Sequence, residues 1–357
     1  MDSAVKELLL LILPTVSSFM QVDKRILEAE YEVHTLYLDQ DRSRLRYLLS
    51  IARMKWFLLT KPSYKRVAVW FADYHAAPAV LLSKWLGKKT LLFIGGYDAV
   101  RYPELKMGVY CSPLRRFCAS LALRNCTHIV ANHTALLSSE NYYYNPSGHP
   151  EGIYRLLPNL STPASVVFNA VPADAPTELN GARIRRILTV GGTPRWQDFY
   201  NKGYDLLLEV ARRRPDMQFV FVGINPAWIG KLKDQKQDTQ LPNVTIYEHL
   251  PHQQVLELMR ESLVYAQPSI SEGMPNALME AMLQGCTPVG SKVAGIPTLI
   301  GDLGYVFSER SSLALEGALD EALSHPLDPA TVSTWISTHF GFETRKQALL
   351  RVTRKYL

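Results

Sequence analysis

Short apolar runs alternate with amphipathic stretches along most of the 357-residue chain. This alternation is typical of parallel β-sheets whose strands are buried on both faces and joined by helices. In the first half, strands are expected at 8–13, 31–38, 67–72, 90–94, 127–130 and 165–168. In the second half, they are expected at 187–190, 218–222, 244–247, 263–266 and 287–289. The pattern therefore predicts an α/β protein with two Rossmann-like halves.

The length of the chain favours two domains over one large core. We place the first domain at residues 1–171 and the second at 185–342, with the polar, proline-containing segment 172–184 as a linker. The apolar run Leu8–Leu13 is too short to span a bilayer, and no small-residue cleavage site follows it. We interpret it as the first buried strand.

A strand, a loop and a helix are expected between residues 263 and 285. Pro275 suits the first turn of a helix, and Gly285 suits the end of that helix. The free amides and the positive dipole end at such a helix start favour a diphosphate, and Gly273 lets the backbone come close to it. This local pattern predicts a phosphate-binding loop.

Two carboxylates flank the expected helix start. Glu280 shares a helix face with Asn276, four residues earlier, so it can reach the hydroxyls of a ribose. Glu272 precedes the helix, where a sugar attached to the diphosphate would lie, and can accept hydrogen bonds from its hydroxyls. The alternative is an ordinary strand-loop-helix turn with solvated acids. Together, these residues favour a nucleotide-sugar site.

The run Glu272-Gly273-x-Pro275-Asn276, followed by Glu280-Ala281 and Gly285-x-x-Pro288-Val289, resembles the donor signature of retaining glycosyltransferases of family 4. The resemblance continues at 187–192, 202–203, 243–245, 250–252, 294–297 and 304, and so covers nearly the whole C-terminal half. It implies the GT-B fold, in which two Rossmann-like parallel-sheet domains face each other across the cleft that holds the active site. It also implies that the last helix, about 343–357, packs back on the first domain.

The resemblance also implies roles for individual residues. The expected donor-binding residues are Gly192, Leu250, Gly273, Met274, Pro275, Asn276 and Glu280. Glu272 and Lys202 are expected to act in catalysis, with Lys202 neutralising the leaving diphosphate and Arg195 as its partner. The family usually has an arginine closer to the loop glycine, so Arg195 is alternatively a solvated loop residue. We expect no metal ion, and front-face substitution in which the leaving phosphate deprotonates the acceptor.

Strand ends in the first half carry polar residues, where doubly wound sheets bind ligands. Ser17 and Ser18 lie in the loop after the first strand, where the family that the chain resembles usually has paired glycines. They either contact the acceptor or cap the next helix. Trp70, Asp73 and His75 are expected to line the acceptor pocket, with a purely structural histidine as the alternative.

The fourth strand is followed by Gly95-Gly96-Tyr97-Asp98, where many relatives have a histidine. Gly96 is expected to contact the acceptor. Asp98 is the candidate to hold a donor sugar hydroxyl or to act as a base, and the alternative is a helix N-terminal acid.

Positive charge is concentrated in the first half. From Arg42 to Arg124 there are 16 Lys and Arg residues against three acidic ones, although the net charge of the whole chain is only +6. A helix is expected in this region, with an apolar stripe that basic residues flank. The stripe consists of Leu45, Leu48, Leu49, Ala52, Trp56 and Leu59. Such a helix either lies on an anionic membrane or packs on its own domain. Leu114, Phe117 and Leu121 form a weaker second case. No nucleic-acid module is recognisable, so we expect no nucleic-acid partner.

The four cysteines (Cys111, Cys118, Cys126 and Cys286) lack the spacing of a zinc site and are too few for a disulfide framework. Such cysteines are expected to be reduced thiols, which indicates the cytoplasm. Together with the basic helix, this predicts a cytoplasmic protein that is peripheral on the inner face of the membrane. The predicted function is transfer of a sugar from a UDP- or GDP-linked donor to a lipid-linked or polysaccharide-precursor acceptor. The alternatives are a GT-B nucleotide-sugar epimerase and a catalytically silent GT-B partner subunit.

Overall fold

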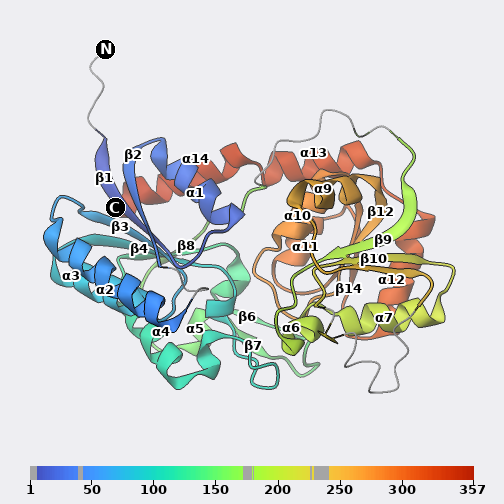
Figure 1. Ribbon diagram of the computed structural model, residues 1–357, viewed down its shortest axis with the longest axis horizontal. Coiled ribbons are helices and arrows are strands. Elements are labelled where there is room, and N and C mark those ends of the chain that lie inside the picture. Colours follow the sequence, from blue (N-terminus) through green and yellow to red (C-terminus); the bar gives the residue numbers. More distant parts are fainter. Residues whose placement is uncertain (1–5, 39–42, 172–178, 180, 226, 229–240) are drawn as a thin grey trace, which may run out of the picture. The chain divides into compact units, whose positions relative to one another are not determined.

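A computed structural model describes residues 6–38, 43–171, 179, 181–225, 227–228 and 241–357 (Figure 1). The chain divides into two compact units. The first unit comprises Met1–Ser139, Pro150–Pro172 and Phe342–Leu357, and the second comprises Glu140–His149 and Ala173–Gly341. Most of the segment expected as a linker, residues 172–178 and 180, lies outside the described residues.

The first unit contains a six-stranded parallel sheet in the order β2-β1-β3-β4-β5-β8. Its strands are β1 (Glu7–Leu13), β2 (Tyr31–Tyr37), β3 (Arg66–Trp70), β4 (Lys89–Ile94), β5 (His128–Ala131) and β8 (Ala164–Val166). Its helices are α1 (Ser18–Glu28), α2 (Arg44–Thr60), α3 (Ala76–Trp85), α4 (Pro113–Asn125), α5 (Ile153–Leu156) and α14 (Phe342–Tyr356). Every strand pair is parallel because helices and longer connections return the chain to the same end of the sheet.

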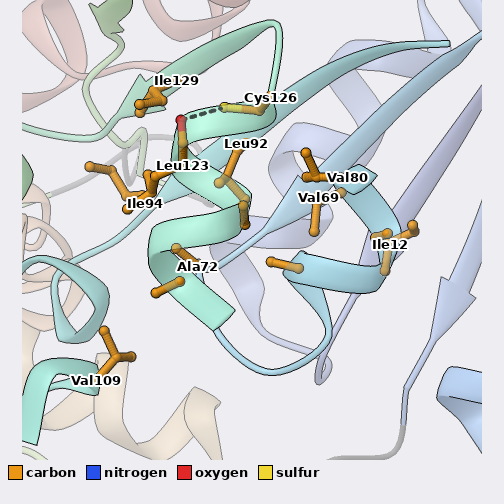
Figure 2. Close-up of a cluster of buried hydrophobic side chains, with 14 of the residues drawn as sticks. Ile12, Val69, Ala72, Val80, Leu92, Ile94, Val109, Leu123, Cys126 and Ile129 are labelled. Carbon is orange, nitrogen blue, oxygen red and sulfur yellow. Dashed lines mark hydrogen bonds between the residues drawn. The ribbon is translucent and has the colours of Figure 1, made fainter. Parts of the chain in front are cut away.

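Both faces of this sheet are buried, which explains the unbroken apolar run of β1. Leu10 and Ile12 pack into a core with α2, α3 and α4, whereas Leu9 and Leu11 pack into a second core with α1 and α14. Figure 2 shows the first core, with strand residues such as Val69 and helix residues such as Val80. Side chains alternate between the two faces along a strand, so a strand buried on both sides has no polar positions.

The last helix belongs to the first unit, although it is 170 residues away from the rest of that unit in sequence. Arg345 of α14 forms a buried ion pair with Asp23 of α1, with 2.6 Å between Nε and Oδ1. The same guanidinium donates to the carbonyl oxygen of Val167 at 2.8 Å. Near the end of the helix, Tyr356 stacks on His128 with ring centroids 3.5 Å apart. Polar and aromatic contacts thus fix α14 along its length.

The second unit contains another six-stranded parallel sheet, in the order β11-β10-β9-β12-β13-β14. Its strands are β9 (Ile184–Val190), β10 (Gln218–Val222), β11 (Val244–Tyr247), β12 (Ser262–Gln267), β13 (Thr287–Ser291) and β14 (Tyr305–Phe307). Its helices include α6 (Trp196–Asn201), α7 (Tyr204–Arg213), α9 (His252–Glu261), α10 (Asn276–Leu283), α11 (Gly295–Ile300), α12 (Ser312–Ser324) and α13 (Pro329–His339). This strand order is that of the dinucleotide-binding Rossmann fold.

The expectation of two Rossmann-like α/β halves is confirmed, and each expected strand is present with its ends within three residues of the prediction. Three further strands were not predicted: β14, and the short pair β6 (Ser139–Glu140) and β7 (Pro150–Glu151). The boundary at residue 171 misses one feature, because residues 140–149 pack in the second unit. Their buried side chains contact that unit, as described below, and this long-range contact leaves no local pattern in the sequence.

Within the described part of the chain, no helix combines the length and the apolar composition that crossing a bilayer would require.

Candidate functional site

The order of the strands marks one place in the second unit where a ligand is expected. The strand order reverses between β9 and β12, and ligands of open α/β sheets bind beyond the carboxyl ends of the strands at such a switch point. The loop after β9 leads through α6 to Lys202, and the loop after β12 leads through Glu272 to α10. The two loops therefore meet where the fold favours ligand binding.

Lys202 and Glu272 form an ion pair at this point. The Nζ atom of Lys202 lies 2.6 Å from Oε1 of Glu272, and both side chains are largely buried. The aliphatic part of Lys202 passes Gly191 at the end of β9, where a Cβ atom would lie 3.4 Å from it. Gly203 follows with a φ of +70°, and a Cβ there would lie 2.3 Å from the Pro268 carbonyl oxygen. A glycine at position 203 lets the two loops approach each other.

Two more side chains hold the Glu272 carboxylate. Ser269 donates its hydroxyl to Oε1 at 2.9 Å, and Gln267 donates from Nε2 to the same oxygen at 3.1 Å. Gln267 is buried and is itself oriented by the hydroxyl of Tyr265, which donates to its Oε1 at 3.2 Å. These contacts place three donors on Oε1 and fix the direction of the carboxylate.

The helix start after Glu272 is built as expected, with one difference. Helix α10 begins at Asn276, and Pro275 is its N-cap instead of a residue of its first turn. The carbonyl oxygen of Gly273 accepts a hydrogen bond from the amide of Gly295 at 3.0 Å. A Cβ on Gly295 would lie 2.4 Å from the same oxygen, so this packing requires glycine. Gly285 follows the helix with a φ of +82°, as expected for a helix end.

Glu280 is buried on the first turns of α10, and its burial raises the pKa of the carboxyl group above the usual 4.5. Nε2 of His252, at the start of α9, lies 3.2 Å from Oε2 of Glu280 and opposes this shift. His252 was noticed in the sequence only as part of the resemblance and was not predicted as a site residue. Its position after the turn that follows β11 was the available signal.

Two residues of the expected donor set and the expected catalytic Arg195 are less enclosed. Gly192 is exposed, and a Cβ there would meet no atom within 4 Å. Leu250 is half-buried ahead of α9. Arg195 is the N-cap of α6 and pairs with Asp198, its Nε donating to Oδ2 at 3.1 Å. The structure therefore brings Lys202, Glu272 and the start of α10 together, and it occupies Arg195 with a local contact.

Asp98 lies in the first unit and is fully committed to backbone amides. Its Oδ1 accepts from Gly95 and Gly96 at 3.0 and 3.1 Å, and its Oδ2 accepts from Ala72 at 3.0 Å. The burial of this carboxyl raises its pKa to about 6. This geometry ties the loops after β3 and β4 together, which favours a structural role, close to the helix N-terminal alternative.

The residues expected around the acceptor are also held by protein contacts. His75 is buried, with Nε2 2.8 Å from the Trp70 carbonyl oxygen and Nδ1 3.3 Å from the Tyr47 hydroxyl, and burial lowers its pKa. Asp73 is buried and forms an ion pair with Arg115 of α4, whose Nε donates to Oδ1 at 2.9 Å. His75 therefore has the contacts of a structural histidine.

The loop after β1 does not show the side-chain cap that was one of the two alternatives for Ser17 and Ser18. Ser17 is the N-cap of α1, yet its side chain makes no capping bond, and its hydroxyl oxygen is buried without a hydrogen-bond partner among the described residues. Ser18 is exposed on the first turn of α1. Gly96 is buried with a φ of +141°, which favours glycine.

Among the residues that the structure describes, no group of three His, Cys, Asp or Glu side chains is arranged to hold a metal ion. The sequence contains one Asp-x-Asp spacing, Asp39 and Asp41, which lies outside those residues. The expectation that no metal takes part therefore stays a prediction.

The sequence model of a family described as Glycosyl transferases group 1 matches residues 197–334. This range includes Lys202, Glu272 and Glu280. The second unit thus carries a group 1 glycosyltransferase match. It covers most of that unit and none of the first, so membership of the whole chain in family 4 stays a prediction.

Curated relatives are similar to part of the chain. The gpi3 subunit of phosphatidylinositol N-acetylglucosaminyltransferase from Schizosaccharomyces pombe is 28% identical over 134 residues, which are 36% of this chain and 29% of that protein. A Homo sapiens protein that is likewise one of the subunits of a phosphatidylinositol N-acetylglucosaminyltransferase is 25% identical over 209 residues, 57% of this chain and 40% of that protein. The chain thus matches less than half the length of these relatives.

Solved structures extend the likeness to both units. HepE of Anabaena, in complex with UDP and glucose, has a TM-score of 0.64 at 15% identity, covering 98% of this chain and 99% of that chain. Sucrose-phosphate synthase from Thermosynechococcus elongatus has a TM-score of 0.69 at 13% identity, with coverages of 98% and 99%. These similarities confirm the predicted fold class, GT-B.

Proposed function

We propose that this protein is a retaining glycosyltransferase that moves a sugar from a UDP- or GDP-linked donor to a lipid-linked or polysaccharide-precursor acceptor. The observation that carries the proposal is the Lys202–Glu272 ion pair beside the start of α10, at the switch point of the second sheet. A fixed cation and helix amides suit a diphosphate, and a carboxylate in the same place suits sugar hydroxyls. Glu280 adds a buried carboxylate on α10 for the ribose.

The proposed reaction is a front-face substitution. The acceptor oxygen bonds to the anomeric carbon on the side from which the diphosphate oxygen departs, and the acceptor proton passes to the departing phosphate. Negative charge grows on the diphosphate as the bond breaks. Lys202 and the first amides of α10 would stabilise that charge, and this supports chemistry that needs no metal ion. Glu272 would orient the sugar through its hydroxyls.

The names of the relatives suggest which substrates to test first. They are subunits of phosphatidylinositol N-acetylglucosaminyltransferases, which supports UDP-N-acetylglucosamine as a donor and an inositol phospholipid as an acceptor. The same names support a role at a membrane. We place the protein at the cytoplasmic face, as a peripheral protein.

An exposed apolar face in the first unit supports the membrane proposal. Helix α2 does pack on its own domain, but it does so through Met54 and Leu58. The predicted stripe points outward instead, and Trp56 is 70% exposed. Trp85 of α3 is 76% exposed, and α3 lies beside both α2 and α4 on the same face of the sheet (Figure 1).

We call this surface the helical face, defined by the exposed Leu48, Leu49 and Trp56 of α2, Trp85 of α3, and Leu114 and Phe117 of α4. Exposed basic residues accompany it, including Arg46 and Arg53 of α2 and Arg116 of α4. Apolar side chains among cations complement an anionic bilayer, because the cations meet lipid phosphates while the apolar groups enter the interface.

The two alternative functions make different demands on the site. A nucleotide-sugar epimerase would bind the same nucleotide but needs no acceptor and no membrane surface. A silent partner subunit needs no intact donor site, whereas here Lys202, Glu272 and Glu280 are present and the first two form an ion pair. The observed geometry therefore favours the transferase.

The experiment is a thermal-shift comparison with UDP, GDP, ADP and their common sugar conjugates. Ligand at about 100 times its dissociation constant should add roughly 2.7 kcal/mol to the free energy of unfolding. Stabilisation by one nucleotide in the native chain, lost in Lys202→Ala and Glu280→Ala, supports the donor site and selects the base. The absence of any shift in the native chain would contradict the proposal.

A further inference from the structure

A segment from the N-terminal half of the chain packs against the loop that carries Glu272. Residues 140–149 comprise the last residue of β6 and the connection to β7, and they belong to the second unit. Two side chains of this segment, Asn141 and Tyr143, are buried, and both reach the backbone just ahead of Glu272. We call residues 268–271, which follow β12, the pre-Glu272 loop.

Asn141 makes the closer contact. Its Nδ2 donates to the carbonyl oxygen of Ile270 at 2.7 Å, and its Oδ1 accepts from the amide of Tyr144 at 2.9 Å. The second bond fixes which end of the amide faces Ile270. A buried carbonyl oxygen without a hydrogen-bond donor is destabilised, because it has also lost its contact with water. This bond therefore holds Ile270 in place.

Tyr143 makes a second contact two residues further back. Its hydroxyl donates to the carbonyl oxygen of Pro268 at 3.3 Å. Its ring packs edge-on against Phe307 with centroids 5.7 Å apart. Burial raises the pKa of the Tyr143 phenol, so the hydroxyl stays protonated and remains a donor.

Other polar groups of the pre-Glu272 loop are held from elsewhere in the second unit. The amide of Ile270 donates to the carbonyl oxygen of Asn201 at 2.7 Å, and the amide of Ser271 donates to Oδ1 of Asn201 at 3.2 Å. Ser291 donates its hydroxyl to the carbonyl oxygen of Ser269 at 2.6 Å. The backbone that precedes Glu272 is thus fixed by three separate segments of the chain.

We infer that Asn141 and Tyr143 are positioning residues for the Glu272 carboxylate and, through it, for the sugar of the donor. This inference rests on the proposed function. It means that the site is not built from residues 185–342 alone, because the N-terminal half supplies two of the contacts that set the position of Glu272. Both residues bond to backbone carbonyl oxygens ahead of Glu272, so their effect on the sugar passes through the backbone of 268–271.

The test uses Asn141→Ala and Tyr143→Phe in the full chain. Two neighbours in the same segment give matched controls: Asn145→Ala and Tyr142→Phe, both at exposed positions. Calorimetric titration with UDP and UDP-N-acetylglucosamine, and with GDP and GDP-mannose, gives the ratio of the affinities for the sugar conjugate and the free nucleotide. We expect this ratio to fall about three- to tenfold in the two test variants and to stay constant in the controls.

A double variant separates positioning from a general loss of structure. In a Glu272→Gln background, Asn141→Ala should leave the remaining ratio unchanged, because the two changes act on the same contact. The inference is overturned if the native chain binds a nucleotide sugar and the ratio in Tyr143→Phe and Asn141→Ala equals that of the controls. It is also overturned if the two variants weaken nucleotide and conjugate equally. A native chain that binds no nucleotide would instead overturn the proposed function, and this inference with it.

Discussion

The ammonium group of Lys202 and the carboxylate of Glu272 lie 2.6 Å apart across the two loops that follow β9 and β12. Each group thereby has a partner of opposite charge. A bound diphosphate would compete with Glu272 for Lys202, and a bound sugar hydroxyl would compete with Lys202 for Glu272. We therefore expect the pair to separate when the donor binds.

The pair gives a first prediction about activity. Lys202→Ala should lower kcat by about 10²- to 10³-fold, because the charge that grows on the leaving diphosphate loses a fixed cation. Glu272→Gln should weaken the affinity for the sugar conjugate more than for the free nucleotide. Steady-state rates and calorimetric titration measure the two effects. Loss of free-nucleotide binding in Glu272→Gln, equal to the loss for the conjugate, would contradict the assigned roles.

Most strands of the two sheets were predictable because parallel strands buried on both faces are continuous apolar runs, as in Leu8–Leu13. The donor loop was predictable because Glu272, Gly273 and Pro275 lie close together in sequence. Local patterns did not predict contacts between distant segments. The packing of Asn141 on Ile270 joins residues 129 positions apart, and no local pattern reports such a contact.

Which side of α2 is buried could not be predicted from the sequence pattern either. The apolar stripe that includes Leu48 and Trp56 is mostly exposed, while Met54 and Leu58 face the core. Both sides of this helix carry apolar residues, so periodicity alone did not decide which side is buried. Trp85 of α3 was not predicted as part of this surface, because only the packing of α3 beside α2 brings it there.

The helical face gives a second prediction. The double variant Trp56→Ser/Trp85→Ser should reduce co-sedimentation with vesicles that contain phosphatidylserine, because its two most exposed aromatic side chains are lost. Leu313→Ser is a matched control, since Leu313 is 71% exposed on α12 of the second unit. Binding should also fall in Arg46→Gln/Arg53→Gln and on neutral vesicles. Binding that ignores lipid charge and all of these substitutions would contradict the membrane proposal.

Asp98 gives a third prediction, which concerns pH. Burial raises its pKa from 3.8 to about 6, so in this window the folded protein binds the proton more tightly than the unfolded chain does. The contribution of Asp98 to the free energy of unfolding therefore falls as pH rises from 3.8 to about 6. Urea unfolding of the native chain and of Asp98→Asn across this range should show their difference in stability shrinking with rising pH.

The same variant distinguishes a structural Asp98 from one that holds the donor sugar. An asparagine amide cannot accept hydrogen bonds at both ends, so Asp98→Asn should lose about 1–3 kcal/mol of stability. Its affinity for the nucleotide sugar should equal that of the native chain, because the carboxylate oxygens accept the amides of Ala72, Gly95 and Gly96. A stable variant with weakened binding of the sugar conjugate would restore the role first expected for Asp98.

The fourth prediction concerns α14 and the buried ion pair between Arg345 and Asp23, both of which are almost inaccessible to solvent. Arg345→Met should lower the free energy of unfolding by about 3–5 kcal/mol, because it leaves the Asp23 carboxylate buried without its partner. It also removes the donor to the Val167 carbonyl oxygen. Arg354→Met is a control on the same helix, since Arg354 pairs with Glu30 at the surface, and its effect should be small.

A second change at Asp23 tests the reason for that loss. If the uncompensated carboxylate causes it, the double variant Asp23→Leu/Arg345→Met should regain much of the stability lost by Arg345→Met alone, since neither charge is then buried. Urea midpoints, with m-values to show that the compactness of the two end states is unchanged, give the comparison. A double variant as unstable as Arg345→Met would instead assign the loss to the carbonyl contacts of Arg345, and α14 would then be held chiefly by its hydrogen bonds to the segment after β8.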